Sequence, residues 1–257
     1  QLNSKDFPAN KKYAIPLSIT GASNYSLIPS QRSAILLLNR SILSSVAKVS
    51  GGEGIRIKPV GMHTKAEWTI QMSAIYSSLT RSNLTTAYLS NGTGGEFYPR
   101  ISSTAGIQVK NGRDGDDTWT QIPLQAGKWL HITYVHKDKK TTVYVNGKVQ
   151  KVFENSAITF GENSMIVVGN SGYRNDYLRE IRLWDKALTE SEINDYLYLP
   201  MDPATPHLIS YLPLSKEMET KDLKAPAGTE NVTTKARIEY VENVKFPADE
   251  LVIVNQE

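Results

Sequence analysis

The sequence predicts an all-β protein in which antiparallel strands form a two-sheet sandwich with one short helix. Three observations support this fold class. Short runs of strand-forming residues with period-two alternation recur along the chain. Turn-forming Gly, Pro, Asn and Asp residues separate these runs. Helical periodicity is almost absent, so the crossover helices that a parallel sheet requires are missing.

The clearest strand signals lie between residues 129 and 153. Trp129–His136 alternates between two faces, and Thr141–Val145 and Lys148–Phe153 follow it. Between the last two segments, Asn146-Gly147 favours a two-residue type I′ hairpin, because both residues tolerate positive φ. An antiparallel three-stranded meander is therefore expected here.

Further segments with the same pattern complete the predicted sheets, and turn residues bound each of them. They are Trp68–Ile75, Thr86–Leu89, Phe97–Ile101, Gly106–Val109, Met165–Val168, Glu180–Trp184 and Leu208–Leu214. The tail adds strand-like pieces at Arg237–Val241 and Leu251–Val254. Many short strands of this kind favour a sandwich over an α/β sheet.

One short helix is predicted after Leu188. Thr189 and Glu192 have the spacing of a capping box, in which each side chain bonds the other residue's backbone N–H. Leu188 and Ile193 are placed to form a hydrophobic staple. The helix must end before Pro200. We expect it to cap a sheet end and to have a structural role.

The two ends of the chain differ from this central body. Tyr13–Ile19 and Ser33–Leu38 predict two strands, which are only marginally stable in water by themselves. Either preceding strands are missing, or the hairpin docks on the body or on another molecule. Residues 43–54 are predicted to be a linker with a flexible point at Gly51-Gly52. Residues 217–257 are predicted to be a C-terminal extension with strand pieces.

Composition limits the classes of function. The chain has 257 residues, of which 40% are hydrophobic and 21% charged, as expected for a folded globular protein. A net charge of +3 without a basic cluster argues against a nucleic-acid partner. No cysteine is present, which excludes disulfides, thiolate metal sites and a cysteine nucleophile. The longest apolar run, Ala34–Leu38, is too short to span a membrane.

Three segments resemble the laminin-G-like, concanavalin A-like jelly-roll family, which includes lectins and glucanases. Ala126–Tyr134 resembles the family's strand that begins near a tryptophan, and Thr142–Lys148 resembles the hairpin after it. Arg179–Ile193 resembles the late strand that runs into a short helix, and Leu208–Leu214 resembles the closing strand. The resemblance implies an antiparallel jelly roll over residues 55–216.

The opening segment Lys12–Ile19 resembles the second half of an immunoglobulin-like domain of unknown function. That domain precedes laminin-G-like modules in surface lipoproteins of glycan-foraging gut bacteria. The resemblance implies a partial immunoglobulin-like segment over residues 1–42. It also implies export to the outer-membrane surface or periplasm of a Gram-negative bacterium, and a role in glycan utilisation.

Glycan cleavage finds no candidate motif. Jelly-roll glucanases use a Glu-x-Asp-x-x-Glu pattern, whose period-two spacing places the first two acids on one face of a strand. No Glu-x-Asp occurs in this chain, and Glu190, Glu192 and Asp195 belong to the predicted helix. Gly-x-Ser-x-Gly is also absent. A hydrolase would need an unrecognised acid pair from separate strands, and this alternative stays open.

Metal binding has one candidate segment. Asp114, Asp116 and Asp117 concentrate the hard oxygen ligands that calcium prefers. The same residues are typical of an exposed turn, so calcium and a solvated turn are alternatives. His131 and His136 are five residues apart on one predicted strand, so they face opposite sides and cannot bind one metal together.

Glycan binding requires an aromatic ring that stacks on a sugar, with planar polar groups beside it. One predicted loop between two strands combines an aromatic, a guanidinium, an amide and a carboxylate in Tyr173, Arg174, Asn175 and Asp176. Further candidate ligand-binding residues are Tyr98, Arg100 and Trp119. For each, an aromatic that covers the core or lies singly on the surface is the alternative. The remaining tryptophans lie inside strand patterns and are expected in the core: Trp68, Trp129 and Trp184.

We therefore expect a non-catalytic carbohydrate-binding module that binds polysaccharide or glycoprotein glycans through its end loops. The alternative is a structural or protein-interaction module of a surface assembly with other surface proteins as partners, because unpaired strands recruit partner strands. A glycoside hydrolase is the third hypothesis. Calcium is the one cofactor that the sequence suggests.

Overall fold

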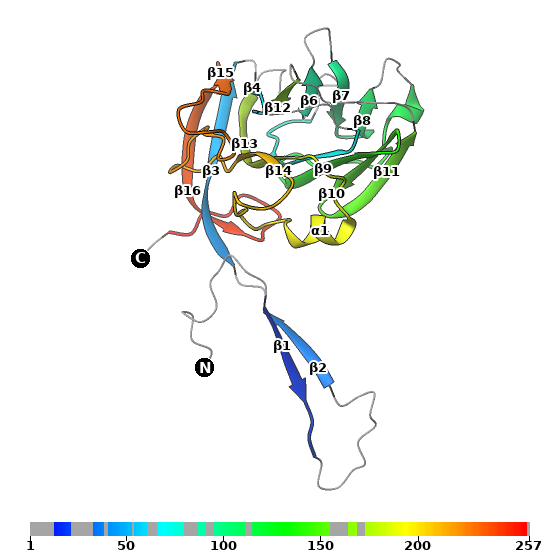
Figure 1. Cartoon of the computed structure of the whole chain (residues 1–257), viewed down its shortest axis with the longest axis vertical. Coiled ribbons are helices and arrows are strands. Elements are labelled where there is room, and N and C mark those ends of the chain that lie inside the picture. The colour runs from blue at the N-terminus through cyan, green and yellow to red at the C-terminus, as the bar shows by residue number, and fades with distance from the viewer. Residues whose placement is uncertain are drawn as a thin grey trace.

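The computed structural model describes residues 13–21, 33–38, 41–52, 54–60, 66–79, 87–90, 95–110, 115–154, 164–168 and 173–255. Two antiparallel sheets pack into a sandwich, and a two-stranded hairpin lies apart from them (Figure 1). The prediction of an all-β, two-sheet antiparallel fold with one short α-helix is confirmed for these residues.

The larger sheet has eight strands within the described residues, in the order β11-β10-β9-β5-β13-β3-β16, with β14 paired to β13. Their bounds are β3 Ile42–Gly51, β5 Trp68–Ile75, β9 Trp129–Lys137, β10 Lys140–Val145, β11 Lys148–Glu154, β13 Tyr173–Trp184, β14 Leu208–Leu212 and β16 Arg237–Phe246. The meander predicted from the sequence is confirmed as β9, β10 and β11. Asn146 and Gly147 have φ values of 51° and 75°, as the predicted turn requires.

The smaller sheet has the order β15-β4-β12-β6-β7-β8. Its strands are β4 Ile55–Ile57, β6 Ala87–Ser90, β7 Gly95–Ser102, β8 Gly106–Lys110, β12 Met165–Val168 and β15 Val232–Thr234. The core lies between the two sheets, where the ring of Phe97 in β7 packs 5.1 Å from the rings of both Trp68 and Tyr134. Each fully buried side chain of this size stabilises the fold by about 1.5–3 kcal/mol.

Helix α1, Glu190–Asp195, begins with the predicted capping box. The hydroxyl of Thr189 accepts from the backbone N–H of Glu192, and the Glu192 carboxylate accepts from the Thr189 N–H at 2.9 Å. Ile193 is buried against Trp184 and Tyr211, on the outer face of the larger sheet. The helix therefore covers a sheet face as a structural element. No helix of the described residues is long and apolar enough to cross a membrane.

Two boundary predictions are corrected. Residues 43–54 are not a linker, because Ile42–Gly51 forms β3 between β13 and β16, with Val46, Ala47 and Val49 fully buried. The serines and the lysine that alternate with these residues conceal the strand pattern. The predicted extension is likewise part of the sandwich, since β15 pairs with β4 and β16 pairs with β3. Leu251–Val254 contributes only an isolated bridge, between Ile253 and Val244.

The N-terminal hairpin consists of β1, Tyr13–Ser18, and β2, Ser33–Leu38, paired in antiparallel register. In the described part of the chain, neither strand pairs with any other strand. Figure 1 shows the hairpin extending away from the sandwich. Ile35 is 67% exposed and Leu17 is 49% exposed. The two predicted strands are thus confirmed, whereas the immunoglobulin-like assignment stays a prediction.

Candidate functional site

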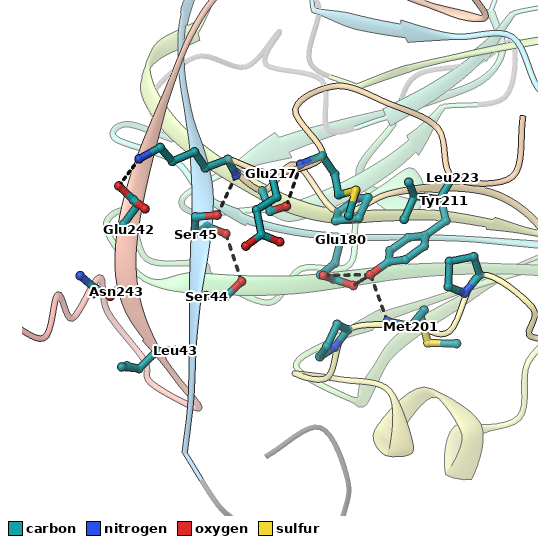
Figure 2. Close-up of a pocket in the computed structure, with 16 residues that line it drawn as sticks. Leu43, Ser44, Ser45, Glu180, Met201, Tyr211, Glu217, Leu223, Glu242 and Asn243 are labelled. Carbon is teal, nitrogen blue, oxygen red and sulfur yellow. Dashed lines mark hydrogen bonds and ion pairs between the residues drawn. The ribbon is translucent and has the colours of Figure 1, made fainter. Parts of the chain in front are cut away.

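A cleft of about 520 Å³ opens at the larger sheet, between β3, β14, β16 and the segments that follow α1 and β14 (Figure 2). Hydroxyl, carboxylate, amide and ammonium groups line it together with apolar walls of proline, methionine and leucine. The polar residues of the lining are Ser44, Ser45, Glu180, Tyr211, Ser215, Lys216, Glu217, Glu242 and Asn243.

The opening results from the way that β13 changes partners. Its first half, up to Leu178, pairs with β3, whereas its second half, from Ile181, pairs with β14 along the same edge. Glu180 lies between the two halves with φ 55°, at a bulge in the pairing with β5. A bulge adds one unpaired residue and bends the strand. The cleft therefore forms where β3 leaves the edge of β13 and β14 takes its place.

The Glu180 carboxylate lies at the bottom of this cleft and is 5% exposed. It accepts from Arg182 at 2.5 Å, from Arg179 at 3.4 Å and from the hydroxyl of Tyr211 at 3.0 Å. The Tyr211 hydroxyl in turn accepts from the backbone N–H of Met201 at 3.0 Å. Burying a carboxylate requires this kind of pairing. Burial and the nearby Glu180 raise the pKa of Tyr211, which keeps its hydroxyl protonated as a donor.

The rim of the cleft carries charges that are exposed to solvent. Lys216 donates from its ammonium to Glu242 at 2.6 Å and from its backbone N–H to the Ser45 hydroxyl at 2.7 Å. Glu217 is exposed next to them. In the view of Figure 2, its side chain lies between Ser44 and Glu180. The rim therefore offers carboxylate and hydroxyl acceptors above a buried carboxylate.

A buried aspartate holds one wall of the cleft against β14. The carboxylate of Asp222 accepts from the Ser210 hydroxyl at 2.7 Å, the Tyr211 N–H at 2.9 Å and the Asn231 amide at 2.8 Å. It also accepts from the Lys224 N–H at 3.0 Å. Because four donors converge on one carboxylate, the segment after β14 is fixed in place.

The segment of residues 196–200 covers a buried polar cluster behind Glu180. Arg182 donates to the carbonyl of Tyr196 at 2.9 Å and to that of Leu199. His131 lies beside it, with Nδ1 2.6 Å from the Ser73 hydroxyl. Burial, and then the positive charges of Arg179 and Arg182, lower the pKa of His131 to about 3. The imidazole is therefore neutral near neutral pH.

The predicted loop Tyr173–Asp176 is not a loop. It forms the first residues of β13, whose backbone pairs with Gly51, Ser50 and Val49 of β3. Asp176 is 3% exposed and accepts from the backbone N–H of Ser77 at 2.7 Å, so it fixes the chain after β5. Asn175 is exposed at a bulge, with φ 65°. Alternation resumes only after this bulge, which explains why the sequence pattern missed the start of the strand.

The structure brings three other predicted residues into one row. On β7, the guanidinium carbon of Arg100 lies 5.6 Å from the ring centroid of Tyr98. Arg100 is opposite Gln108 of β8, and Gln108 is opposite the half-buried Trp119. None of the residues predicted to bind ligand lines the cleft. The Tyr98–Arg100–Trp119 row is thus a separate region on the smaller sheet.

For the predicted calcium segment, the described residues include Asp116 and Asp117 in a short 3₁₀ turn, Asp116–Thr118, whereas Asp114 lies outside them. The ammonium of Lys151 donates to the carbonyls of Asp117 and Trp119 at 2.8 and 2.6 Å. A cationic side chain of the protein itself thus bonds these carbonyl oxygens. Within the described ranges, no three or more His, Asp or Glu side chains form a group that could hold a metal.

Comparison with known families agrees with this architecture. A laminin-G-type family model that describes the concanavalin A-like lectin/glucanases superfamily matches residues 50–194, more than half of the chain. The chain therefore belongs to this superfamily, as its resemblance indicated. No curated protein matches the sequence.

Solved structures give the same fold at low sequence identity. A proposed carbohydrate binding protein from Bacteroides ovatus is 18% identical, with a TM-score of 0.61 over 96% of this chain and 72% of that one. The native heptameric SAP-like pentraxin of Limulus polyphemus is 14% identical, with a TM-score of 0.50 over 78% of this chain and 94% of that one. At these identities the likeness establishes the fold alone.

The residues that build the cleft were not predicted as a site. One signal was available in the sequence: Arg179-Glu180-Ile181-Arg182 places three charges inside an otherwise apolar strand pattern. Two arginines three residues apart cannot share a face of a regular strand. Since both are buried on the outer face here, a bulge must lie between them.

Proposed function

We propose that this protein is a non-catalytic carbohydrate-binding module and that the cleft above Glu180 is its glycan site. The cleft itself is the observation that carries the proposal. Its volume of about 520 Å³ falls within the range of small-molecule sites, about 300–1,000 Å³. Its hydroxyl, amide and carboxylate groups can hydrogen-bond to the hydroxyls of a sugar. In place of an exposed stacking aromatic ring, its proline, methionine and leucine walls would contact the apolar face of the sugar ring.

The charges of the cleft favour binding over cleavage. A glycosidase needs one protonated carboxyl group as general acid and a second carboxylate across the bond. Glu180 accepts from two guanidiniums and a tyrosine hydroxyl, so its carboxylate is already engaged in the buried network below the cleft. Glu242 is ion-paired with Lys216. Both carboxylates are therefore held by partners of the chain itself, and a sugar hydroxyl would donate to the exposed carboxylate of Glu217 at the rim.

Membership of a lectin and glucanase superfamily supports the glycan as ligand, as does the fold shared with the Bacteroides ovatus protein. We further propose an extracytoplasmic site of action, at the outer-membrane surface or in the periplasm, in a lipoprotein of glycan utilisation. The resemblance of the opening segment to surface lipoproteins supports this part.

A glycan array followed by isothermal titration of each positive glycan tests the proposal. Glu217→Ala removes an exposed acceptor from the rim, and we expect it to weaken binding about tenfold, which corresponds to about 1.4 kcal/mol. The matched control is Glu230→Ala, which removes an exposed glutamate outside the cleft. Absence of binding to any plant, host or microbial glycan would argue against the module. Release of reducing sugar from mixed polysaccharides would instead favour a hydrolase.

The hairpin supports a second candidate function, a structural or protein-interaction module. Its strands have no other partner strands among the described residues, and Leu17 and Ile35 are exposed. Unpaired strand edges recruit further strands. Light scattering should then detect a complex with another surface protein or a self-associated species. A strictly monomeric chain that cross-links to no surface protein would count against this candidate.

A further inference from the structure

A second, much smaller cavity also borders Glu180. It lies among the buried polar side chains on the outer face of the larger sheet. It leaves about 10 Å³ for the centre of a water-sized sphere, which is room for one small ion or molecule. The polar side chains around it are Gln71, Ser73, His131, Thr133, Glu180 and Arg182. It is thus surrounded by β5, β9 and β13.

Several buried nitrogen atoms of this cluster have no hydrogen-bond partner in the described residues. They are Nε of Arg179, Nε of Arg182 and Nε2 of His131, and each of these side chains is less than 5% exposed. Arg182 and His131 line the cavity directly. A buried N–H group without a partner is costly, so a native structure normally supplies one.

The cluster also carries an excess of positive charge. Arg179 and Arg182 contribute two buried cations, whereas Glu180 contributes one buried anion. Burial lowers the pKa of Arg179; the charge of Glu180 opposes this shift, and the positive charge of Arg182 adds to it. The pKa of His131, lowered by burial and by both arginines, reflects the same positive field. One positive charge is therefore left without a buried counter-charge, which is unfavourable.

The acceptors nearest these nitrogens are already engaged with other donors. Both oxygens of Glu180 already accept from arginine and tyrosine. The amide oxygen of Gln71 accepts from the Trp184 indole N–H at 2.9 Å, and its amide nitrogen donates to the Thr133 hydroxyl. Donors thus predominate around the cavity.

We propose that this cavity binds one small monovalent anion of the halide class, held by Nε of Arg182 and Nε2 of His131. An anion would satisfy both nitrogens and neutralise the excess charge. Its presence selects the tautomer in which the Ser73 hydroxyl donates to Nδ1 and Nε2 carries the proton. Sulfate and larger anions do not fit a space for one water-sized particle. A water molecule, the other occupant of suitable size, would leave the charge uncompensated.

Anomalous diffraction from crystals of the full chain grown in sodium bromide tests the proposal directly. We expect a bromide peak within hydrogen-bonding distance of Arg182 Nε and His131 Nε2. A site that refines as water without anomalous signal, in crystals that hold bromide elsewhere, would overturn it.

Thermal unfolding provides an independent test in solution. The melting temperature should be a few degrees higher in sodium chloride than in sodium gluconate of the same ionic strength, and the increase should saturate. Arg179→Met removes the excess charge and should abolish this difference, whereas the exposed control Lys137→Met should keep it. If Arg179→Met retains the full difference, or if the wild type shows none, the proposal fails.

Discussion

Two regions of this sandwich carry aromatic and charged groups, and they are built in different ways. The cleft at Glu180 is concave, and strands far apart in sequence supply its lining. The row of Tyr98, Arg100 and Trp119 is assembled from neighbouring strands of the smaller sheet and its adjoining turn. Three of the residues that the sequence suggests for ligand binding lie in this row, and none lies in the cleft. The cleft is concave because β13 changes its partner strand from β3 to β14, and no local sequence pattern reveals this change.

The strongest contrast should appear in stability. Glu180→Ala leaves two guanidiniums buried without their counter-charge, and we expect it to destabilise the fold by about 3–5 kcal/mol. Arg100→Ala, in the half-buried row, should cost about 1 kcal/mol or less. Urea unfolding followed by tryptophan fluorescence measures both. Equal losses would mean that the buried cluster is not a stabilising centre of the sheet.

The cluster behind the cleft should also make stability depend on pH. The pKa of His131 is lowered to about 3 in the folded state, against about 6.5 when unfolded, so the unfolded state binds the proton more tightly. Stability is therefore lost as the pH falls below about 6.5. In a halide-free buffer, where no bound anion favours the protonated imidazole, this histidine alone should remove about 2 kcal/mol of stability between pH 7 and pH 5. His131→Phe should remove that part of the pH dependence, as measured by urea unfolding at both pH values, and an unchanged slope would contradict the assignment.

Substitutions in the two regions should also differ in their effect on glycan affinity. Ser45→Trp fills the cleft from β3 and should weaken glycan binding at least tenfold, or about 1.4 kcal/mol. Tyr98→Ala should leave the affinity within about twofold of the wild type. Isothermal titration with one glycan from the array measures both variants, with circular dichroism as the check of folding. If Tyr98→Ala weakens binding and Ser45→Trp does not, the glycan site lies at the row of Tyr98, Arg100 and Trp119.

The smallest effect is expected at the turn beside the row. Lys151→Met leaves the carbonyls of Asp117 and Trp119 without their shared donor, and should cost about 1 kcal/mol. Thermal unfolding with and without calcium measures the change. A calcium-dependent rise in stability of the wild type would contradict the view that Lys151 supplies the cation at these carbonyls.

The sequence pattern predicts local turns and caps, but it does not predict pairing between distant strands. Local chemistry was predictable: Asn146-Gly147 formed its hairpin turn, and Thr189 with Glu192 formed the capping box. Strand β3 was missed because Ser44, Ser45 and Lys48 interrupt its apolar residues, although its neighbours β13 and β16 bury it. These neighbours lie more than a hundred residues away in sequence. Their pairing is a property of the whole sheet.

The candidate site was even less predictable. Its lining depends on a bulge at Glu180 and on the change of partner from β3 to β14. A single sequence gives the residue types at these positions but not the register between strands. The three charges of Arg179, Glu180 and Arg182 were visible, and only the pairing explains why they are buried together.

NMR chemical-shift mapping of the wild-type chain, with a glycan that binds on the array, tests whether the cleft is the glycan site. We expect the largest shifts at the cleft residues Ser45, Glu217 and Asn243, and we expect them to saturate with the titrated affinity. Shifts confined to Tyr98, Arg100 and Trp119, with none at the cleft, would contradict this assignment.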